Sequence, residues 1–340
     1  MLYPHGLDES HEVGPGRLAG QRKLVEGDVV PDARPSDDET GIVVVTYQSA
    51  GVLSGLLDSL PAACAGVRTR LVVVDNASTD DTRQIIRALP DAQLVARDVN
   101  AGYAAALNVG YAALSENGPV GSVLVLNPDI RLRPGALARL TAALSEPGIG
   151  IAVPCLLGPT GTVTFGLRRE PTIRRALGEA LLGGHRASRF PALGELVTDP
   201  ETYRSASIAD WATGAAMLIS RDCWAAVGSW DESFFLYSEE TDFALRARDA
   251  GYTLRYVPDA VAQHLGGDAT SDPRLHALLT RNRVHLHRKR WGRTRAACFW
   301  AAVAVGEALR APRSALHRHG LRALLPGGHA VVARPGPAPP

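Results

Sequence analysis

Short runs of β-branched and other apolar residues alternate along the chain with stretches whose apolar residues recur at helical spacing. The strand-like runs are 41–47, 71–75, 93–96 and 123–126, and the helical patterns cover 52–60, 79–89, 104–114 and 134–144. Continuous apolar runs are typical of strands buried on both faces. Their alternation with helices predicts an α/β fold with a doubly wound, mostly parallel sheet. We expect Pro61 to end the first helix.

Polar residues stand where these strand-like runs end. Tyr47 ends the first run, Asp75 ends the second, and Asn127 and Asp129 follow the fourth. Ligands of an open α/β sheet bind beyond the carboxyl ends of its strands. We therefore expect these four side chains to gather along one edge and to form part of a binding site.

The pattern changes after this half of the chain. Over 155–205 it breaks up into Gly, Pro and Arg, which we interpret as a variable, partly mobile insertion. Order returns at 211–219, continues in an acidic helix, and ends in a strand pair, 253–257 and 260–263, followed by His264. The sequence thus predicts one α/β domain over 41–270 that carries an insertion.

The two ends of the chain differ in charge from the whole, whose formal net charge of +1 indicates no attraction to nucleic acid. Residues 1–40 carry nine acids against four bases and no apolar period, which predicts a disordered segment without a signal-peptide pattern. From Arg281 onward, twelve bases face a single acid, Glu307. We expect a basic helical extension over 271–325 and a disordered Pro/Gly-rich tail over 326–340.

The spacing of the cysteines and the length of the apolar stretch near the C-terminus indicate the cellular compartment of the protein. Four cysteines lie far apart without a C-x-x-C pair, which fits reduced thiols in a cytoplasmic protein. The apolar stretch 296–305 is about half the ~20 residues that a membrane-spanning helix needs. Its Phe299 and Trp300, flanked by bases, suggest instead a helix that docks on the anionic inner face of a membrane. The same helix could equally pack its apolar face against the domain.

Three carboxylates, Glu239, Glu240 and Asp242, follow an aromatic run at the start of a predicted helix with Ser238 as its N-cap. The positive end of a helix dipole favours ionised carboxylates. An ionised carboxylate beside an aromatic-lined pocket can act as general base toward a sugar hydroxyl. The alternative is that these acids only stabilise the helix N-terminus, as acids commonly do.

Two further segments are suited to a nucleotide. Asp75 ends a strand and can accept hydrogen bonds from a pyrimidine N–H or a ribose hydroxyl, while Ser78 or Thr79 caps the next helix. The small-residue loop 100–103, continued by Asn108 and Gly110, would allow close approach of a diphosphate. Ordinary turns have similar sequences, so a turn without a ligand remains the alternative at both places.

A divalent cation, Mg²⁺ or Mn²⁺, could bind at Asp129. Such cations usually take one or two protein carboxylates together with substrate phosphates. His264 follows a strand and is a candidate second ligand. A solvated strand-to-turn junction and a structural histidine are the alternatives.

Seven segments from Gly41 to His264 occur in the order found in family-2 glycosyltransferases of the GT-A fold, which this chain resembles. They read VVVTYQSA, VVVDNASTDDT, NAGYAAALNVG, VLVLNPDIRL, WATGAAMLISR, DESFFLYSEETDFALRARDAGY and VPDAVAQH. The Asn127-Pro128-Asp129 triplet looks like the family's variant of the Asp-x-Asp metal motif, in the form typical of its rhamnosyltransferase-like branch. The resemblance implies a GT-A sheet with a C-terminal helical extension. It also implies inverting sugar transfer, with dTDP-L-rhamnose as the favoured donor and a glycan, lipid-linked or small-molecule glycoside as acceptor.

The resemblance also assigns roles to individual residues. Nucleotide-sugar binding falls to Thr46, Tyr47, Asp75, Asn76, Ser78, Asn100, Gly102, Tyr103, Asn108, Asn127 and Asp129. The acceptor cleft falls to Trp211, Gly214 and Ala215, the metal to Asp129 and His264, and catalysis to Glu239, Glu240 and Asp242. Glu240 takes the place of the base, where the family usually has Asp. Its additional methylene moves the carboxylate outward by roughly 1 Å, which matters for positioning.

Three other functions compete with this prediction. A nucleotidyltransferase would carry a Gly- and Lys-rich phosphate loop after the first strand, whereas residues 48–51 contain no Lys. A non-catalytic nucleotide-sugar-binding scaffold is compatible with Asn127 and Glu240 at the motif positions. A UDP-hexose donor would suit the same fold.

Overall fold

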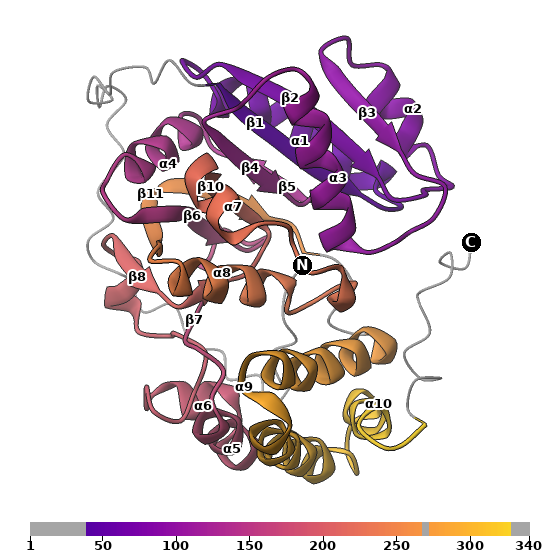
Figure 1. Ribbon diagram of the computed structural model, residues 1–340, viewed down its shortest axis with the longest axis vertical. Coiled ribbons are helices and arrows are strands. Elements are labelled where there is room, and N and C mark those ends of the chain that lie inside the picture. The colour runs from indigo at the N-terminus through magenta and orange to yellow at the C-terminus, as the bar shows by residue number, and fades with distance from the viewer. Residues whose placement is uncertain (1–38, 267–271, 328–340) are drawn as a thin grey trace.

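A nine-stranded sheet runs through the computed structural model (Figure 1), which describes residues 39–266 and 272–327. Its strands are β1 (Thr40–Thr46), β2 (Thr69–Asp75), β3 (Ala92–Ala96), β4 (Ser122–Leu126), β5 (Ile130–Leu132), β6 (Ile149–Leu157), β8 (Ser207–Ala209), β10 (Ala216–Ser220) and β11 (Thr253–His264). The order is β3-β2-β1-β4-β10-β6-β11-β5, with β8 paired to β11. The expected disordered segments lie outside the described residues, apart from 39–40 and 326–327.

Strand direction follows the prediction of a mostly parallel sheet. β1 pairs in parallel with β2 and β4, β2 with β3, and β6 with β11. Only β10, β5 and β8 run against their neighbours in this described sheet. The register places Thr46 opposite Asp75 and Val44 opposite Leu126. The ends of β1, β2 and β4 therefore lie side by side, as the sequence predicted.

Helices cover both faces of this sheet (Figure 1). They are α1 (Ala50–Ala63), α2 (Thr82–Arg87), α3 (Tyr103–Glu116), α4 (Ala136–Leu144), α7 (Arg221–Val227) and α8 (Glu239–Asp249), with a 3₁₀ turn η2 (Glu232–Phe234) before α8. Val43 and Val45 of β1 belong to one core with α3 and α8, whereas Ile42 and Val44 belong to the other with α1 and α4. A strand buried on both faces needs apolar residues at every position, which explains its continuous apolar run.

Three element boundaries differ from the prediction. Helix α1 continues past Pro61 to Ala63, since a proline near the end of a helix removes one hydrogen bond while the helix buries an apolar face. The expected strand pair at 253–263 is the single strand β11, whose register shifts between Val257 and Val261. Pro258 has no N–H for the ladder, and an irregularity accommodates it. Helix α2 begins at Thr82, so neither Ser78 nor Thr79 is its cap.

The insertion and the C-terminal extension pack together into one layer beneath the sheet (Figure 1), which the sequence did not indicate. We call this layer the helical module. It comprises α5 (Ile173–Leu182), α6 (Gly184–Ser188), α9 (Pro273–Arg310) and α10 (Ala315–Ala323). Phe299, Ala302 and Val303 of α9 bury their side chains with Ala176 of α5. Arg283 of α9 forms ion pairs with Glu179 and Glu195 of the insertion.

Helix α9 is a hairpin of two arms and not a continuous rod. It breaks at Gly292, whose φ of 79° suits glycine. Nε2 of His276 lies 2.9 Å from Oε2 of Glu307, although a straight helix would separate residues 31 positions apart by about 46 Å. We call residues 273–291 the first arm and residues 293–310 the second arm. No helix within the described ranges is both long and apolar enough to span a bilayer.

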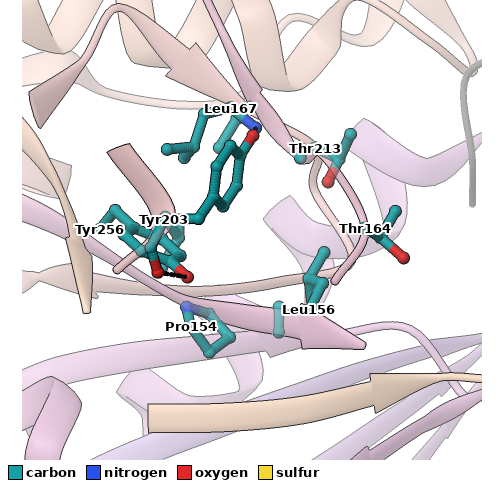
Figure 2. Close-up of a pocket in the computed structure, with 11 residues that line it drawn as sticks. Pro154, Leu156, Thr164, Leu167, Tyr203, Thr213 and Tyr256 are labelled. Atoms are coloured by element: carbon teal, nitrogen blue, oxygen red, sulfur yellow. Dashed lines mark hydrogen bonds between the residues drawn. The ribbon is translucent and has the colours of Figure 1, made fainter. Parts of the chain in front are cut away.

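The insertion is also tied to the sheet above it. β7 (Leu167–Arg168) pairs with β9 (Trp211–Ala212) in a separate two-stranded sheet, whereas a 3₁₀ turn η1 (Pro200–Tyr203) carries Tyr203, whose ring centroid lies 5.4 Å from that of Tyr256 on β11. Figure 2 shows Tyr203 and Tyr256 around a cavity of about 10 Å³, with the Tyr256 hydroxyl donating to the Tyr203 carbonyl at 3.2 Å. Such a volume holds about one water molecule. This cavity is therefore a packing gap and not a site for a nucleotide sugar.

Candidate active site

Backbone strain in the described chain is confined to the loops around the carboxyl edge of the sheet and the start of α8. The non-glycine residues with positive φ are Gln48 after β1, Ala77 after β2, and Phe235, Tyr237 and Ser238 before α8. Such conformations cost on the order of 1–3 kcal/mol each and persist where surrounding contacts enforce them, as at active sites. Ser238 does occupy the N-cap position of α8, but with a φ of 73° its side chain makes no capping hydrogen bond.

Asn282 of the first arm fixes the strained loop. Its side-chain amide donates to the carbonyls of Phe234, Leu236 and Tyr237 at 2.6, 2.9 and 3.2 Å. From the other side, the backbone N–H of Tyr103 donates to the Phe235 carbonyl at 2.7 Å. Asn282 could not be predicted from the sequence, because an asparagine more than forty positions downstream in a basic helix carries no local signal of this role.

The acid pair at the start of α8 is buried. Glu239 and Glu240 expose only 3% and 6% of their surface. Burial, together with the charge of Glu240, raises the pKa of Glu239 well above its usual range. The helix dipole was expected to keep these acids ionised, and for Glu239 the cost of burial exceeds that effect. Oε2 of Glu239 has no hydrogen-bond partner among the described residues.

Asp242 differs from this pair. It is fully buried, and its two oxygens accept hydrogen bonds from Arg246 at 2.7 Å and from Lys289 at 2.8 Å. These ion pairs join α8 to the first arm of α9. Asp242 was expected to be one of the catalytic acids, whereas in the structure both of its oxygens have partners.

Asp129 and His264 meet as the sequence suggested. Asp129 follows β4 and His264 ends β11, and Oδ2 of Asp129 lies 3.1 Å from Nε2 of His264. The N–H of Leu265 donates to the Asp129 carbonyl at 3.1 Å, which holds the two segments together. Burial raises the pKa of Asp129, but the hydrogen bond with His264, the charge of His264 and smaller contributions together exceed this effect, and the net shift is downward. An ionised carboxylate oxygen next to an imidazole nitrogen is a donor set that fits a divalent cation.

Tyr103 connects the acid pair with the Asp129–His264 pair. Its hydroxyl donates to the Gly214 carbonyl at 3.3 Å. Burial raises the pKa of Tyr103, and so do the nearby charges of Glu239, Glu240 and Asp129. Gly214 itself lies against Glu240, because a β-carbon at position 214 would be 3.3 Å from the β-carbon of Glu240. Glu239, Glu240 and Asp129 therefore lie close enough to Tyr103 for their charges to act on its hydroxyl, and burial and the two glutamates also raise the pKa of Tyr237.

The expected nucleobase end is more enclosed than the sequence indicated. Asp75 is fully buried and accepts hydrogen bonds from Thr46 Oγ1 at 3.1 Å, the Ser78 N–H at 3.0 Å and Arg83 Nε at 2.5 Å. A nucleobase would reach this carboxylate only by displacing one of these donors. Tyr47, which follows Thr46 in the chain, is half-buried and remains a candidate contact for the nucleobase.

The small-residue loop is held at this edge by side-chain amides. Asn76 donates to the Gly102 carbonyl at 2.9 Å, and the side-chain oxygen of Asn100 accepts from the Gly102 N–H at 3.0 Å. A β-carbon at Gly102 would lie 2.3 Å from the Phe235 carbonyl oxygen. Glycine is thus required where this loop meets the strained loop.

Two predicted site residues lie elsewhere. The side-chain amide of Asn108 donates to the Trp230 carbonyl at 3.0 Å and accepts from the Trp230 N–H at 2.9 Å. Asn108 therefore anchors the segment before η2. Trp211 is 3% exposed and donates to the Arg169 carbonyl at 3.0 Å, so it belongs to the core and not to an open cleft. Ala215 and Asn127 stay at the edge, joined by a backbone hydrogen bond of 2.9 Å.

Comparison with known proteins agrees with this geometry. Residues 41–193 match the family model "Glycosyl transferase family 2", and residues 200–314 match "Glycosyl transferase family group 2". An N-acetylglucosaminyl-diphospho-decaprenol L-rhamnosyltransferase of Mycobacterium tuberculosis is 32% identical over 251 residues, 70% of this chain and 80% of the relative. The chain belongs to glycosyltransferase family 2. The rhamnosyltransferase WbbL of Escherichia coli is 24% identical over 66% of this glycosyltransferase and 82% of its own length.

Solved structures show the same fold. GalNAc-T7 with UDP, GalNAc and Mn²⁺ matches with a TM-score of 0.58 at 14% identity, over 80% of this chain and 51% of the other. The mannosyltransferase PcManGT of Pyrobaculum calidifontis, with GDP-Man and Mn²⁺, matches with a TM-score of 0.50 at 18% identity, over 90% and 86%. The predicted GT-A fold is thereby confirmed.

Proposed function

We propose that this glycosyltransferase moves L-rhamnose from dTDP-L-rhamnose to a hydroxyl of a lipid-linked sugar, with inversion at the anomeric carbon. The meeting of Glu240, Tyr103 and the Asp129–His264 pair at one edge of the sheet carries the proposal. The names of two relatives, both L-rhamnosyl- or rhamnosyltransferases, support the sugar, and the decaprenol-linked substrate in one name supports the acceptor class. The nucleotide rests on the Asn127-Pro128-Asp129 form of the motif.

Glu240 is the proposed base. Its carboxylate takes the proton of the acceptor hydroxyl as that oxygen bonds to the anomeric carbon, and the bond to the diphosphate oxygen breaks. The dTDP leaves with the electron pair of that bond, so one displacement inverts the configuration. Gly214 has no side chain, so it does not crowd the Glu240 side chain against which it lies. Asn282 and Tyr103 hold the loop that leads into α8 and thereby orient the base.

Asp129 and His264 are the proposed ligands of a divalent cation. When bound, such a cation stabilises the negative charge of a leaving diphosphate. The pair offers one oxygen and one nitrogen at adjoining strand ends, and the 3.1 Å contact between them holds both in place. Two protein ligands leave positions for phosphate oxygens, so cation and nucleotide should bind together.

Transfer assays with purified protein test this function. dTDP-L-rhamnose, UDP-N-acetylglucosamine and UDP-glucose are each offered with a polyprenyl-diphosphate N-acetylglucosamine acceptor. Turnover should be fastest with dTDP-L-rhamnose and should stop when a chelator is added. Faster turnover with a UDP-hexose would favour the alternative donor. Nucleotide-sugar binding without transfer or hydrolysis would favour a scaffold.

A lipid-linked acceptor makes membrane contact useful, and we propose that the helical module provides it. Eleven large hydrophobic side chains are exposed in the described chain, and eight of them lie in or directly beside this module. They are Leu177, Leu181, Leu182, Phe190, Trp300, Val305, Leu309 and Leu325. Exposed bases such as Arg174, Arg186 and Arg313 lie beside them in the sequence. Apolar groups flanked by bases suit the interface of an anionic bilayer.

The proposed membrane contact differs in one respect from the contact expected from the sequence. Phe299, expected to face the membrane, is buried against α5 together with Val303. Truncation near Trp291 would expose that core, so substitutions are the better test. Leu181→Glu combined with Leu309→Glu should abolish sedimentation with anionic vesicles at low salt, whereas Ile208→Glu on β8, an equally exposed position, should not. Equal sedimentation of both variants would refute docking by this face.

A further inference from the structure

Three metal-ligating side chains meet at the open end of the α9 hairpin, opposite the turn at Gly292. His276 lies on the first arm, Glu307 on the second arm and His317 on α10. Nε2 of His276 and Nδ1 of His317 each lie 2.9 Å from Oε2 of Glu307. The two imidazole rings are perpendicular, with centroids 4.9 Å apart. One carboxylate oxygen is thus approached by nitrogens from two other helical segments.

We propose that His276, Glu307 and His317 bind a divalent transition-metal cation, with the ligand chemistry of Zn²⁺, that clamps the hairpin and α10 together. One ligand atom from each residue can be chosen so that all three lie within 4.8 Å of one another. Zinc bonds of about 2.0–2.2 Å in tetrahedral geometry separate ligand atoms by roughly 3.3–3.5 Å. Opening the two contacts by about half an ångström would therefore admit the cation, with water as a fourth ligand.

The surroundings of the cluster favour a buried cation. Glu307 is the only acid from residue 281 to the C-terminus, among twelve bases, yet it is buried at this place. His276 is buried as well. Buried charges are ordinarily paired or coordinate a metal. Two imidazoles and one carboxylate form a donor set found in metal sites with an open position.

Gly320 of α10 allows the helices to approach closely enough. A β-carbon at position 320 would lie 2.3 Å from Oε2 of Glu307 and 3.0 Å from Cδ2 of His276. A side chain there would displace the Glu307 carboxylate or push α10 away, and either change would separate the three ligand groups. Gly320 thus provides a test that leaves all three ligands in the sequence.

The site is separate from the Asp129–His264 pair in residues and in role. The first arm also carries Asn282, which holds the strained loop before α8. A cation that fixes the open end of the hairpin would hold this arm in place. We therefore expect it to stabilise the fold and not to take part in sugar transfer.

The test uses full-length protein purified without a histidine tag, stripped with chelator, and carrying Asp129→Asn to remove the other cation site. Zn²⁺ should bind with one equivalent at micromolar affinity or tighter and raise Tm by roughly 5 °C at about 100-fold excess over Kd. Co²⁺ should give visible absorption bands of a nitrogen–oxygen site. Metal analysis of unstripped protein shows which cation, Zn²⁺ or Fe²⁺, the site retains.

His317→Ala and Gly320→Ala should each lose the Zn²⁺ equivalent, the Tm shift and the Co²⁺ bands. His319→Ala, on the same helix with its ring 3.0 Å from the Ala315 carbonyl, is the matched control and should keep all three. Circular dichroism of the stripped variants establishes that they fold. Absence of Zn²⁺ binding below about 10 μM in the folded parent, or binding unchanged in His317→Ala, would overturn the proposal and leave a hydrogen-bonded cluster.

Discussion

Two buried glutamates, Glu239 at the sheet edge and Glu307 in the helical module, have pKa values that are shifted in opposite directions. Burial and the charge of Glu240 raise the pKa of Glu239 well above its usual range. Burial would raise the pKa of Glu307 too, but hydrogen bonds with His276 and His317 lower it to about 2. Burial is common to both, so the neighbours decide the direction. Glu307 accepts contacts from two imidazoles, whereas Oε2 of Glu239 has no hydrogen-bond partner among the described residues.

This difference indicates where the fold accepts an energetic cost. Uncompensated carboxylates destabilise a folded protein, and they persist at sites that perform chemistry. Paired carboxylates in the module connect segments that are distant in sequence. If the sheet edge carries the chemistry and the module positions it, substitutions in the two regions should differ in their effects on kcat and on stability.

The largest expected effect comes from Glu240→Gln. Loss of the base should reduce kcat by about 10³-fold while nucleotide affinity stays within about threefold, because the base contacts the acceptor and not the donor. Steady-state transfer assays and nucleotide titration measure the two quantities. An inactive Glu239→Gln beside an active Glu240→Gln would move the base to Glu239. Glu240→Asp restores the usual family residue: a faster rate would mean that the native Glu is a compromise, and a slower one that the pocket fits it.

A smaller effect on kcat is expected from Asn282, through which the helical module contacts the loop before α8. Asn282→Ala leaves three carbonyls of the strained loop without their donor, which should cost about 1–3 kcal/mol of unfolding free energy. The loop orients the base, so kcat should fall roughly tenfold with little change in donor KM. His285→Ala, on the same arm and 3.0 Å from the Ser233 hydroxyl, is the control and should keep normal kcat. A fall in stability alone would limit Asn282 to the fold.

The smallest effect concerns Glu239 and pH. Because its folded pKa is raised, the folded protein keeps a proton that the unfolded chain has lost above about pH 4.5, so stability falls as pH rises toward the folded pKa. Glu239→Gln removes this loss. The variant should be more stable than the parent at pH 8 and equally stable at pH 4, measured by urea unfolding. Exposed Glu116→Gln should show no such pH dependence, and a gain equal at both pH values would contradict the raised pKa.

The sequence predicted the sheet edge better than it predicted the module. Tyr47, Asp75, Asn127 and Asp129 could be placed together because parallel strands end at the same edge, and a continuous apolar run marks each strand. The roles of Asn108, Trp211 and Asp242 could not be judged in this way. Each has the residue type of a ligand or a catalytic group, but its partners, such as Lys289 for Asp242, come from elements far along the chain.

What the sequence determined by itself is local in origin: alternating strand and helix patterns, the acid-rich start of α8 and the motifs of glycosyltransferase family 2. The tertiary structure alone decided which acids are paired, because hydrogen bonds and ion pairs depend on distances of a few ångströms between distant segments. It also decided that α9 folds back at Gly292, which brings His276, Glu307 and His317 together. A glycine break in a helical pattern does not specify the angle between its arms. The packing of Phe299 and Val303 against α5 specifies it.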